Sequence, residues 1–305
     1  MPKPEISLKN PHDSFFKKLF DNEENVRDFL EAYLPKQLSS NIDFNSVKII
    51  DTEKENKKHK KYYLDLSVEC DIGETPSKVY IVFEHKSYYD KFTLMQILNY
   101  CLTIWENEIE NKQEFLTPIV PFVFYHGKQK SKLKHNFHEY FEPNKALDGY
   151  LMDFKFVIFD TNEIENDDII KKINNLYLSA SLLLMKNIFK DVRELKPILK
   201  EIVTLDDDRV IRLFEYIVVN NDLQEEEFIE IVKEIKGDDK MSSLAQRWLD
   251  QGIQQGISQG IETGIQQGVF ETAIVMIKDF QITIDDVTQK LNIRKDELLE
   301  YMRNK

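Results

Sequence analysis

The chain has 305 residues, 42% hydrophobic and 31% charged, which is typical of a soluble globular protein with room for two or three domains. Its formal net charge of −13 argues against a protein that coats nucleic acid, because phosphate binding depends on lysine and arginine. No apolar run is long enough to span a membrane, the start lacks a signal peptide, and two isolated cysteines form no disulfide framework. We therefore expect a cytoplasmic protein.

The first 162 residues predict a mixed α/β domain. Residues 12–34 carry apolar side chains at helical spacing and predict two short helices. One strong helix is predicted over about residues 92–110, among five runs with β character. These runs span residues 47–50, 62–70, 79–83, 119–125 and 154–159.

An all-helical region, residues 163–238, and a glycine-repeat tail, residues 239–305, are predicted to follow. Gly252, Gly256, Gly260, Gly264 and Gly268 recur at every fourth position of the tail, and each costs a helix about 1 kcal/mol. The glycine stripe would let a second backbone approach closely, which favours a homo-oligomer formed through residues 250–270. A flexible linker is the alternative.

The tail suggests two further features. Met241 stands just before the glycine repeat, and one hypothesis is that a separate C-terminal product starts there and restrains the full-length chain. The last residues predict two short helices, 284–291 and 295–302. We interpret this pair as a helical hairpin rather than a DNA-reading helix-turn-helix.

Acidic residues occupy matching positions on two neighbouring predicted strands. Polar residues alternate with apolar ones around Asp65, and Glu84 and Lys86 share one face of the next strand. A hairpin centred between Glu74 and Thr75 would set Asp65 opposite Glu84, with Cβ atoms about 5 Å apart. Two carboxylates at that spacing repel each other unless a cation lies between them, and such oxygen ligands suit Mg²⁺.

Lys86 lies beside this predicted metal site. An ammonium group there can stabilise charge that develops on a phosphate, while the metal lowers the pKa of the attacking water. The arrangement predicts hydrolysis of phosphodiester bonds. The alternative is an exposed hairpin with ordinary surface charges, although the apolar neighbours Leu64 and Leu66 are typical of a buried strand.

Two basic segments flank the predicted site. Residues 54–61 (KENKKHKK) precede it and residues 128–135 (KQKSKLKH) follow it. We expect them to contact the DNA backbone. Two solvated loops are the alternative interpretation.

Several motifs along the chain resemble those of the recombination-promoting nuclease (Rpn) family, a group of PD-(D/E)XK nucleases also described as transposases. They are HDSFFKKLF at residues 12–20, DFL at 28–30, LP at 34–35, LDL at 64–66, FEHKS at 83–87, WE at 105–106 and PFVFYHG at 121–127. The resemblance resumes in the glycine repeat and therefore covers most of the chain.

This resemblance implies a restriction-endonuclease-like core and cleavage of DNA that depends on Mg²⁺, with Mn²⁺ as a substitute. The expected role is recombination, transposition or defence against mobile DNA such as phage. By similarity, Asp65 and Glu84 are metal ligands, the main-chain carbonyl of His85 is a third ligand, and Lys86 is the catalytic lysine. Many members carry Gln at the position of Lys86, and Leu64 stands where the superfamily motif has Pro.

Other polar residues are weaker candidates. Gln96 and Tyr100 lie four apart on one predicted helix, a pair that related nucleases use to orient the metal site or the phosphate. The alternative is a solvated Gln96 and a Tyr100 packed in the core. Glu23 or Asp28 is a less favoured extra carboxylate, and we interpret His126 as structural rather than catalytic.

Two classes of function stay open. The first is a DNA endonuclease, whose dimer would present two active sites. The second is a catalytically degenerate nuclease fold that regulates or assembles through its glycine repeat. The intact set of Asp65, Glu84 and Lys86 favours the enzyme.

Overall fold

The computed structural model describes residues 10–50, 53–55, 61–63, 65–73, 77–142, 145–147, 149–221, 268–291 and 293–303. The chain divides into two compact units, one of Glu5–Met241 and the other of Ser242–Lys305 together with Met1–Pro4. Met241 and most of the glycine repeat, from Gly252 to Gly264, lie outside the described residues, so the predicted glycine helix stays a prediction.

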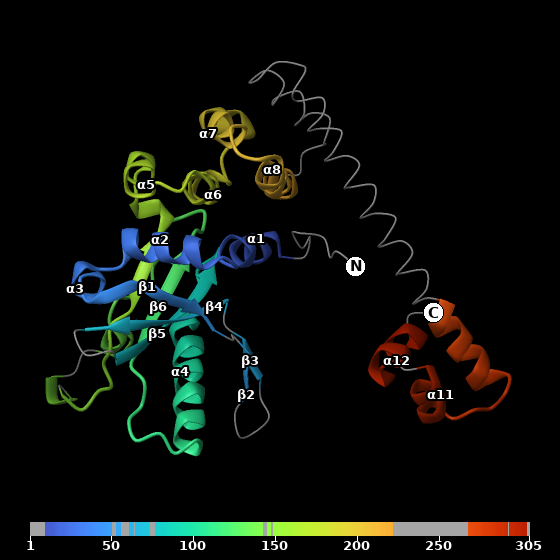
Figure 1. Ribbon diagram of the computed structural model, residues 1–305. Coiled ribbons are helices and arrows are strands. Elements are labelled where there is room, and N and C mark those ends of the chain that lie inside the picture. Colours follow the sequence, from blue (N-terminus) through green and yellow to red (C-terminus); the bar gives the residue numbers. More distant parts are fainter. Residues whose placement is uncertain are drawn as a thin grey trace. The chain divides into compact units, whose positions relative to one another are not determined.

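A mixed five-stranded sheet forms the centre of the first unit (Figure 1). Its strands lie in the order β1, β4, β5, β6, β7, with antiparallel pairing from β1 to β5 and parallel pairing from β5 to β7. The strands are β1 (Ile42–Ile49), β4 (Leu66–Ile72), β5 (Ser77–Lys86), β6 (Ile119–Tyr125) and β7 (Val157–Asp160). This architecture confirms the predicted α/β class.

The predicted strand over residues 62–70 is interrupted. Its first part is β3 (Lys61–Tyr63), which pairs with β2 (Glu53–Glu55) in a separate two-stranded ribbon. Its second part is β4, which begins at Leu66 and joins the main sheet. The alternating pattern carried no sign of this break, which falls at Asp65 and is explained by the bonding of that side chain described below.

Helices cover both faces of the sheet (Figure 1). The helix α4 (Thr93–Glu110) connects β5 to β6 and packs on one face, against Val82 of β5 and Val123 of β6. The two predicted N-terminal helices, α1 (Pro11–Leu19) and α2 (Glu23–Tyr33), cover the other face. There the rings of Phe16 and His85 stack with their centroids 4.6 Å apart.

The helical region that follows the sheet packs back on α1. Its main helices are α5 (Asn166–Lys172), α6 (Leu176–Asn187), α7 (Lys196–Ile202) and α8 (Asp207–Asn221); the short helix α3 (Lys36–Ser39) precedes the sheet. The ring of Tyr216 on α8 stacks on Phe15 of α1, with centroids 4.0 Å apart and planes 13° apart. Up to residue 221, therefore, the helical region forms one compact unit with the sheet.

The second unit is a small group of helices. Residues 268–278 are helical, and α11 (Ile284–Leu291) and α12 (Lys295–Arg303) follow, as the sequence predicts. A small apolar core holds them together through the buried side chains of Phe270, Ala273, Val287 and Leu298. Among the described helices of both units, none is long and apolar enough to cross a membrane.

Candidate active site

The antiparallel pair β4 and β5 has the register that the sequence predicts. Leu66 lies opposite Phe83, and Ile72 lies opposite Ser77 at the other end. One further step along this register brings Asp65 opposite Glu84. The two carboxyl side chains therefore approach each other where β4 begins and β5 ends.

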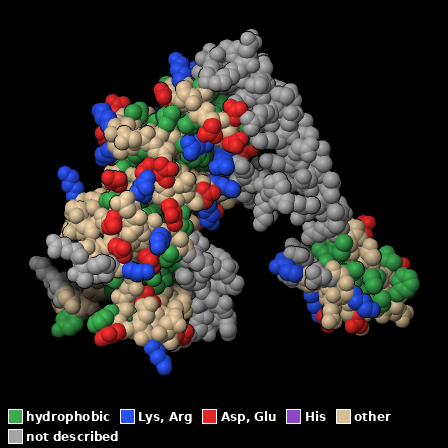
Figure 2. All heavy atoms as spheres, viewed as in Figure 1, with side chains coloured by type: hydrophobic (Ala, Val, Ile, Leu, Met, Phe, Trp, Pro, Cys, Tyr) green, Lys and Arg blue, Asp and Glu red, His purple; other side chains and the backbone are tan. Residues whose placement is uncertain are grey.

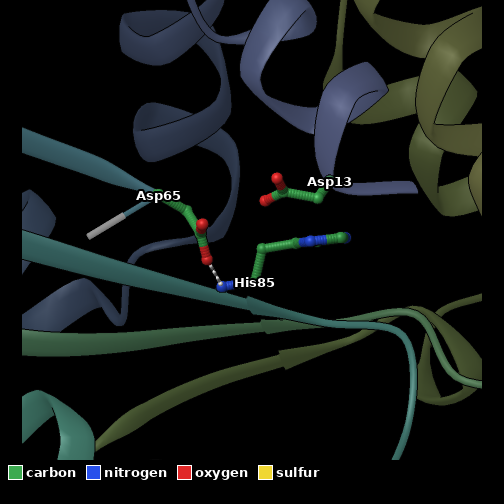
Figure 3. Close-up of side chains that lie close together, drawn as sticks. All are labelled: Asp13, Asp65 and His85. Atoms are coloured by element: carbon green, nitrogen blue, oxygen red, sulfur yellow. Dashed lines mark hydrogen bonds between the residues drawn. The ribbon is translucent and has the colours of Figure 1, made fainter. Parts of the chain in front are cut away.

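Asp65 itself ends the ladder between these strands. Its Oδ2 accepts a hydrogen bond from the backbone N–H of His85, at 2.8 Å (Figure 3). In a regular antiparallel pair, that N–H would bond to the next backbone carbonyl of the neighbouring strand. The carboxylate takes the place of that carbonyl, which accounts for the break in the predicted strand.

The predicted catalytic residues lie together in one cleft of about 260 Å³. Asp65, Glu84 and Lys86 all line it, and α1 contributes further polar side chains. The full lining is Asn10, Asp13, Lys17, Asp65, Glu84, His85, Lys86, Ser87 and Tyr88.

Lys86 and Glu84 form a buried ion pair in the cleft. The Nζ of Lys86 lies 2.9 Å from Oε1 of Glu84 and donates to Oε1 of Gln96, also at 2.9 Å. Burial raises the pKa of Glu84, and the charge of Lys86 opposes that rise. Burial acts to lower the pKa of Lys86, but Glu84 outweighs it and leaves that pKa raised. Lys86 therefore keeps its proton at neutral pH.

Asp65 sits in an environment that disfavours its negative charge. Burial, followed by the nearby charge of Glu84, raises the pKa of Asp65 to about 7, although the His85 N–H opposes this. The ammonium group of Lys17 lies 3.4 Å from Oδ1 of Asp65 and 3.0 Å from Oδ2 of Asp13. Lys17 of α1 therefore partly compensates the negative charges of Asp13 and Asp65.

The residues present fit a divalent cation. Oxygen atoms of Asp13 and Asp65 and a ring nitrogen of His85 all lie within 4.8 Å of one another (Figure 3). The N–H and C=O groups of one strand residue point to the same side, so the His85 carbonyl faces the side on which Asp65 lies. A cation there would relieve the repulsion that raises the pKa of Asp65.

Two residues of this site were missed from the sequence. Asp13 and Lys17 come from α1, far from the predicted strands in the chain. Their four-residue spacing on a helix, inside the HDSFFKKLF motif, was the available signal. Only the packing of α1 on the sheet shows that they face Asp65.

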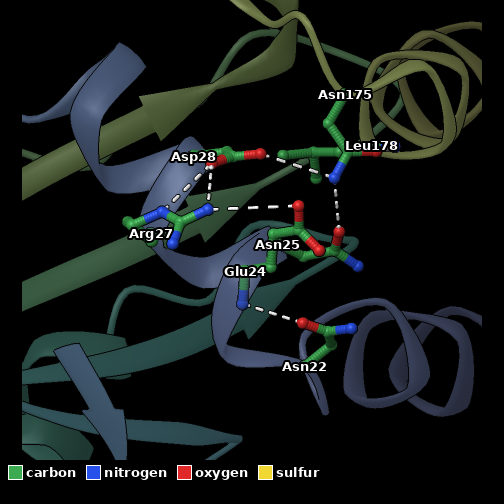
Figure 4. A network of polar contacts seen from close by, with 7 residues as sticks. All are labelled: Asn22, Glu24, Asn25, Arg27, Asp28, Asn175 and Leu178. Carbon is green, nitrogen blue, oxygen red and sulfur yellow. Dashed lines mark hydrogen bonds and ion pairs between the residues drawn. The ribbon is translucent and has the colours of Figure 1, made fainter. Parts of the chain in front are cut away.

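The weaker candidates divide between the site and other places. Gln96 and Tyr100 both belong to α4. Gln96 contacts Lys86, whereas Tyr100 is 1% exposed and packs in the core between α4 and the sheet. Glu23 accepts a hydrogen bond from the backbone of Ile49, outside the cleft. Asp28 pairs with Arg27 of α2 and accepts a hydrogen bond from Asn175 (Figure 4), so neither carboxylate joins the site.

Behind the site runs a chain of buried histidines. Nδ1 of His126 lies 3.0 Å from Nε2 of His85, and Nε2 of His126 lies 3.2 Å from Nδ1 of His12. Nδ1 of His12 is also 2.8 Å from the hydroxyl of Tyr216. A proton on Nδ1 of His126 would be donated to Nε2 of His85, and a proton on Nδ1 of His12 would be shared between Nε2 of His126 and the hydroxyl of Tyr216.

These histidines are neutral in the folded protein. Burial lowers the pKa of His12 to about 4 and that of His85 to about 3. Burial also lowers the pKa of His126 well below its usual value, and neighbouring His85 acts in the same direction. The position of His126, fully buried between other rings, fits the structural role predicted for it.

The second basic segment, residues 128–135, presents exposed lysines. Lys128, Lys132 and Lys134 are exposed, and Lys130 pairs with Glu163. Acidic and basic side chains are interspersed over the face of the first unit in Figure 2. Residues 56–60 of the other basic segment lie outside the described residues, so their contacts stay a prediction.

Known proteins resemble this chain over most of its length. A family model described as "Putative transposase, YhgA-like" matches residues 10–211. Recombination-promoting nuclease RpnD of Escherichia coli O157:H7 is 27% identical over 240 residues, covering 75% of this chain and 88% of the relative. Recombination-promoting nuclease RpnC of E. coli K12 is 26% identical over 254 residues, covering 80% and 82%.

One similar relative bears a different name. The inactive recombination-promoting nuclease-like protein RpnE of E. coli K12 is 25% identical over 262 residues, covering 82% of this chain and 85% of the relative. No solved structure matches the chain. The matched residues 10–211 include the whole sheet, the cleft and most of the helical region. The chain therefore belongs to the YhgA-like family, among the recombination-promoting nuclease (Rpn) proteins.

Proposed function

We propose that this chain is a Mg²⁺-dependent endonuclease that hydrolyses phosphodiester bonds of DNA, with a role in recombination. The observation that carries the proposal is the meeting of Asp65, Glu84 and Lys86 in one cleft, at the predicted strand register. The names of RpnD and RpnC support the same activity.

Each residue of the cleft has a distinct part in this proposal. Asp65, Glu84 and the carbonyl of His85 would hold the cation, with Asp13 close enough to bind it directly or through water. The bound metal would polarise the phosphate and lower the pKa of the attacking water. Lys86, kept protonated by Glu84, would stabilise the charge that develops on the phosphate.

Gln96 and Lys17 would act through other residues. The amide oxygen of Gln96 accepts a hydrogen bond from Lys86 and so fixes the direction of its ammonium group. Lys17 offsets the charges of Asp13 and Asp65 before a cation arrives. Cation binding would therefore displace Lys17 from Asp65.

The wider biological setting belongs to the same proposal. We place the protein in the cytoplasm, acting on mobile DNA either in transposition or in defence against phage. Residues 250–270 would join chains into a homo-oligomer, and a product starting near Met241 would bind to the same region. A regulatory protein without catalysis is the second candidate, because RpnE, named inactive, is nearly as similar as the named nucleases.

A plasmid-nicking assay with Mg²⁺ tests the proposal. The wild-type chain should nick supercoiled DNA, EDTA should stop it, and Asp65→Ala should abolish it. Asp71→Asn, a matched change at the far end of β4, should cleave like the wild type. Cleavage that survives Asp65→Ala would refute the site, and absence of cleavage with bound Mg²⁺ would favour the regulatory candidate.

A further inference from the structure

Three aromatic side chains are exposed beside the cleft. Tyr88 is 64% exposed, Tyr89 45% and Phe92 59%, and all three lie between Lys86 and α4. Tyr88 also lines the cleft. Tyr89 and Phe92 follow Tyr88 within four residues, and exposed aromatic groups this close in the chain to a cleft residue suit contact with a ligand.

The turn that carries these rings is held in place. Oδ1 of Asp90 accepts from the backbone N–H of Phe92 at 2.8 Å, and its carbonyl accepts from the hydroxyl of Thr93 at 2.8 Å. The Thr93 side chain is itself buried at the start of α4. The aromatic side chains are therefore presented by an ordered turn, and the Asp90 carboxylate is engaged within it.

Cationic side chains accompany the rings. The Nζ of Lys91 lies 4.8 Å from the ring centre of Phe92, and the Nζ of Lys86 lies 6.0 Å from that of Tyr88. Positive charge therefore lies near two of the three rings, from the exposed Lys91 and from the buried Lys86. Such a combination suits a ligand with both phosphates and flat rings.

The second basic segment leaves the sheet at the same end as the turn that carries these rings. The parallel strands β5 and β6 pair Lys86 with Tyr125 at their last positions, so the chains after both strands emerge side by side. The segment after β6 carries the exposed Lys128 and Lys132. Burial raises the pKa of Tyr140 beyond this segment, and Tyr89 is close enough to raise it further.

We infer that Tyr88, Tyr89 and Phe92 form a platform on which unpaired bases of a DNA strand stack while its backbone enters the cleft. The inference rests on the proposed nuclease function and specifies its substrate as DNA with single-stranded or locally melted nucleotides. Bases inside a duplex are already stacked on each other and cannot lie against these rings, whereas unpaired bases of any sequence can.

Binding without metal tests the platform separately from catalysis. Fluorescence anisotropy in EDTA would compare three labelled DNAs of about 20 nucleotides: a single strand, its duplex, and a single strand with a central abasic run. The full-length chain should bind the single strand about tenfold more tightly than the duplex. Tyr88→Leu and Tyr89→Leu should each weaken single-strand binding by about fivefold to a hundredfold, the range measured for one base–aromatic stack.

Matched variants identify the cause of any loss. Phe115→Leu also removes an exposed ring, 79% exposed, but it lies beyond the far end of α4, about 25 Å of helix away, and should bind DNA normally. Tyr88→Phe keeps the aromatic face and should retain binding. On the abasic strand, Tyr88→Leu and the wild type should bind equally, because only the bases meet the rings.

Three outcomes would overturn the platform. The first is equal affinity of the wild type for the single strand and the duplex. The second is a loss of affinity in Tyr88→Leu that is as large on the abasic strand as on the normal strand. The third is a tyrosine variant that binds DNA normally but no longer self-associates. The last outcome would assign the rings to a second copy of the chain. Asp65→Ala should keep base-dependent binding, so failure of the nuclease proposal and failure of the platform give different results.

Discussion

The two sides of residue His85 bury polar groups in opposite ways. On the cleft side, Asp65 and Glu84 are largely buried and have raised pKa values. Asp65 pairs with Lys17, and Glu84 pairs with Lys86. On the other side, His12 and His126 are uncharged and form hydrogen bonds with one another, with His85 and with Tyr216. The histidine side stabilises the fold, whereas the cleft side holds charge at a cost to stability, as a site prepared for a cation does.

Removing a charge from the cleft side should have the largest effect. Glu84→Gln preserves shape but removes one proposed metal ligand and the partner of Lys86, so cleavage should fall by about 1,000-fold or more. Initial rates of plasmid nicking would measure it. Glu69→Gln, which loses only the surface pair with Lys78, should cleave normally, and a fully active Glu84→Gln would refute the assignment.

The ammonium group should matter to the rate but not to the cation. Lys86→Gln should lower the cleavage rate by about tenfold to a hundredfold, because transition-state charge loses one stabilising group. Calorimetry should still detect Mg²⁺ binding, since both carboxylates remain. A variant that loses the metal as well would make Lys86 a residue that organises the site.

The histidine side should respond in stability. His126→Phe leaves the ring nitrogens of His85 and His12 without their shared partner, and should lower the free energy of unfolding by about 2–3 kcal/mol. Urea denaturation would measure the change. His135→Gln, at an exposed position, should stay within about 0.5 kcal/mol of the wild type.

The smallest predicted effect has the opposite sign. The pKa of Asp65 is about 7 in the fold against an ordinary 3.8. Its ionisation therefore lowers the free energy of unfolding progressively as pH rises from about 4 to 7, and the loss is complete above pH 7. Asp65→Asn without metal should therefore raise the free energy of unfolding at pH 8, by on the order of 1 kcal/mol. Melting curves in EDTA should show the gain shrink as pH falls below about 7 and disappear near about pH 4, where Asp65 is protonated in both the folded and the unfolded chain.

Mg²⁺ provides the internal check on this last prediction. The cation should stabilise the wild type and leave Asp65→Asn nearly unchanged, so their order of stability should reverse when Mg²⁺ is added. A substitution that destabilises the protein in EDTA at pH 8 would mean that Asp65 is mainly structural.

Local patterns predicted much of the fold and part of the site. Alternation and the turn near Glu74 were enough for the register that opposes Asp65 and Glu84, because both lie close in sequence. The break at Asp65 could not be predicted, since it depends on a side chain replacing a backbone carbonyl.

Contacts between distant segments were not predictable from patterns. The histidine chain joins residues 12, 85, 126 and 216, which come together only after α1 and α8 have packed. Asp13 reaches the site by the same packing. The glycine repeat falls largely outside the described residues, so its predicted association stays open to experiment.

The stacking of Tyr216 on Phe15 has a practical consequence for dissecting this protein. The helix that supplies Asp13 and Lys17 is clamped from outside by α8, some two hundred residues later in the chain. A fragment that ends with the sheet would keep Glu84 and Lys86 but lose α8, whose Tyr216 packs on the helix that carries Asp13 and Lys17. The smallest working fragment should therefore extend at least through Asn221.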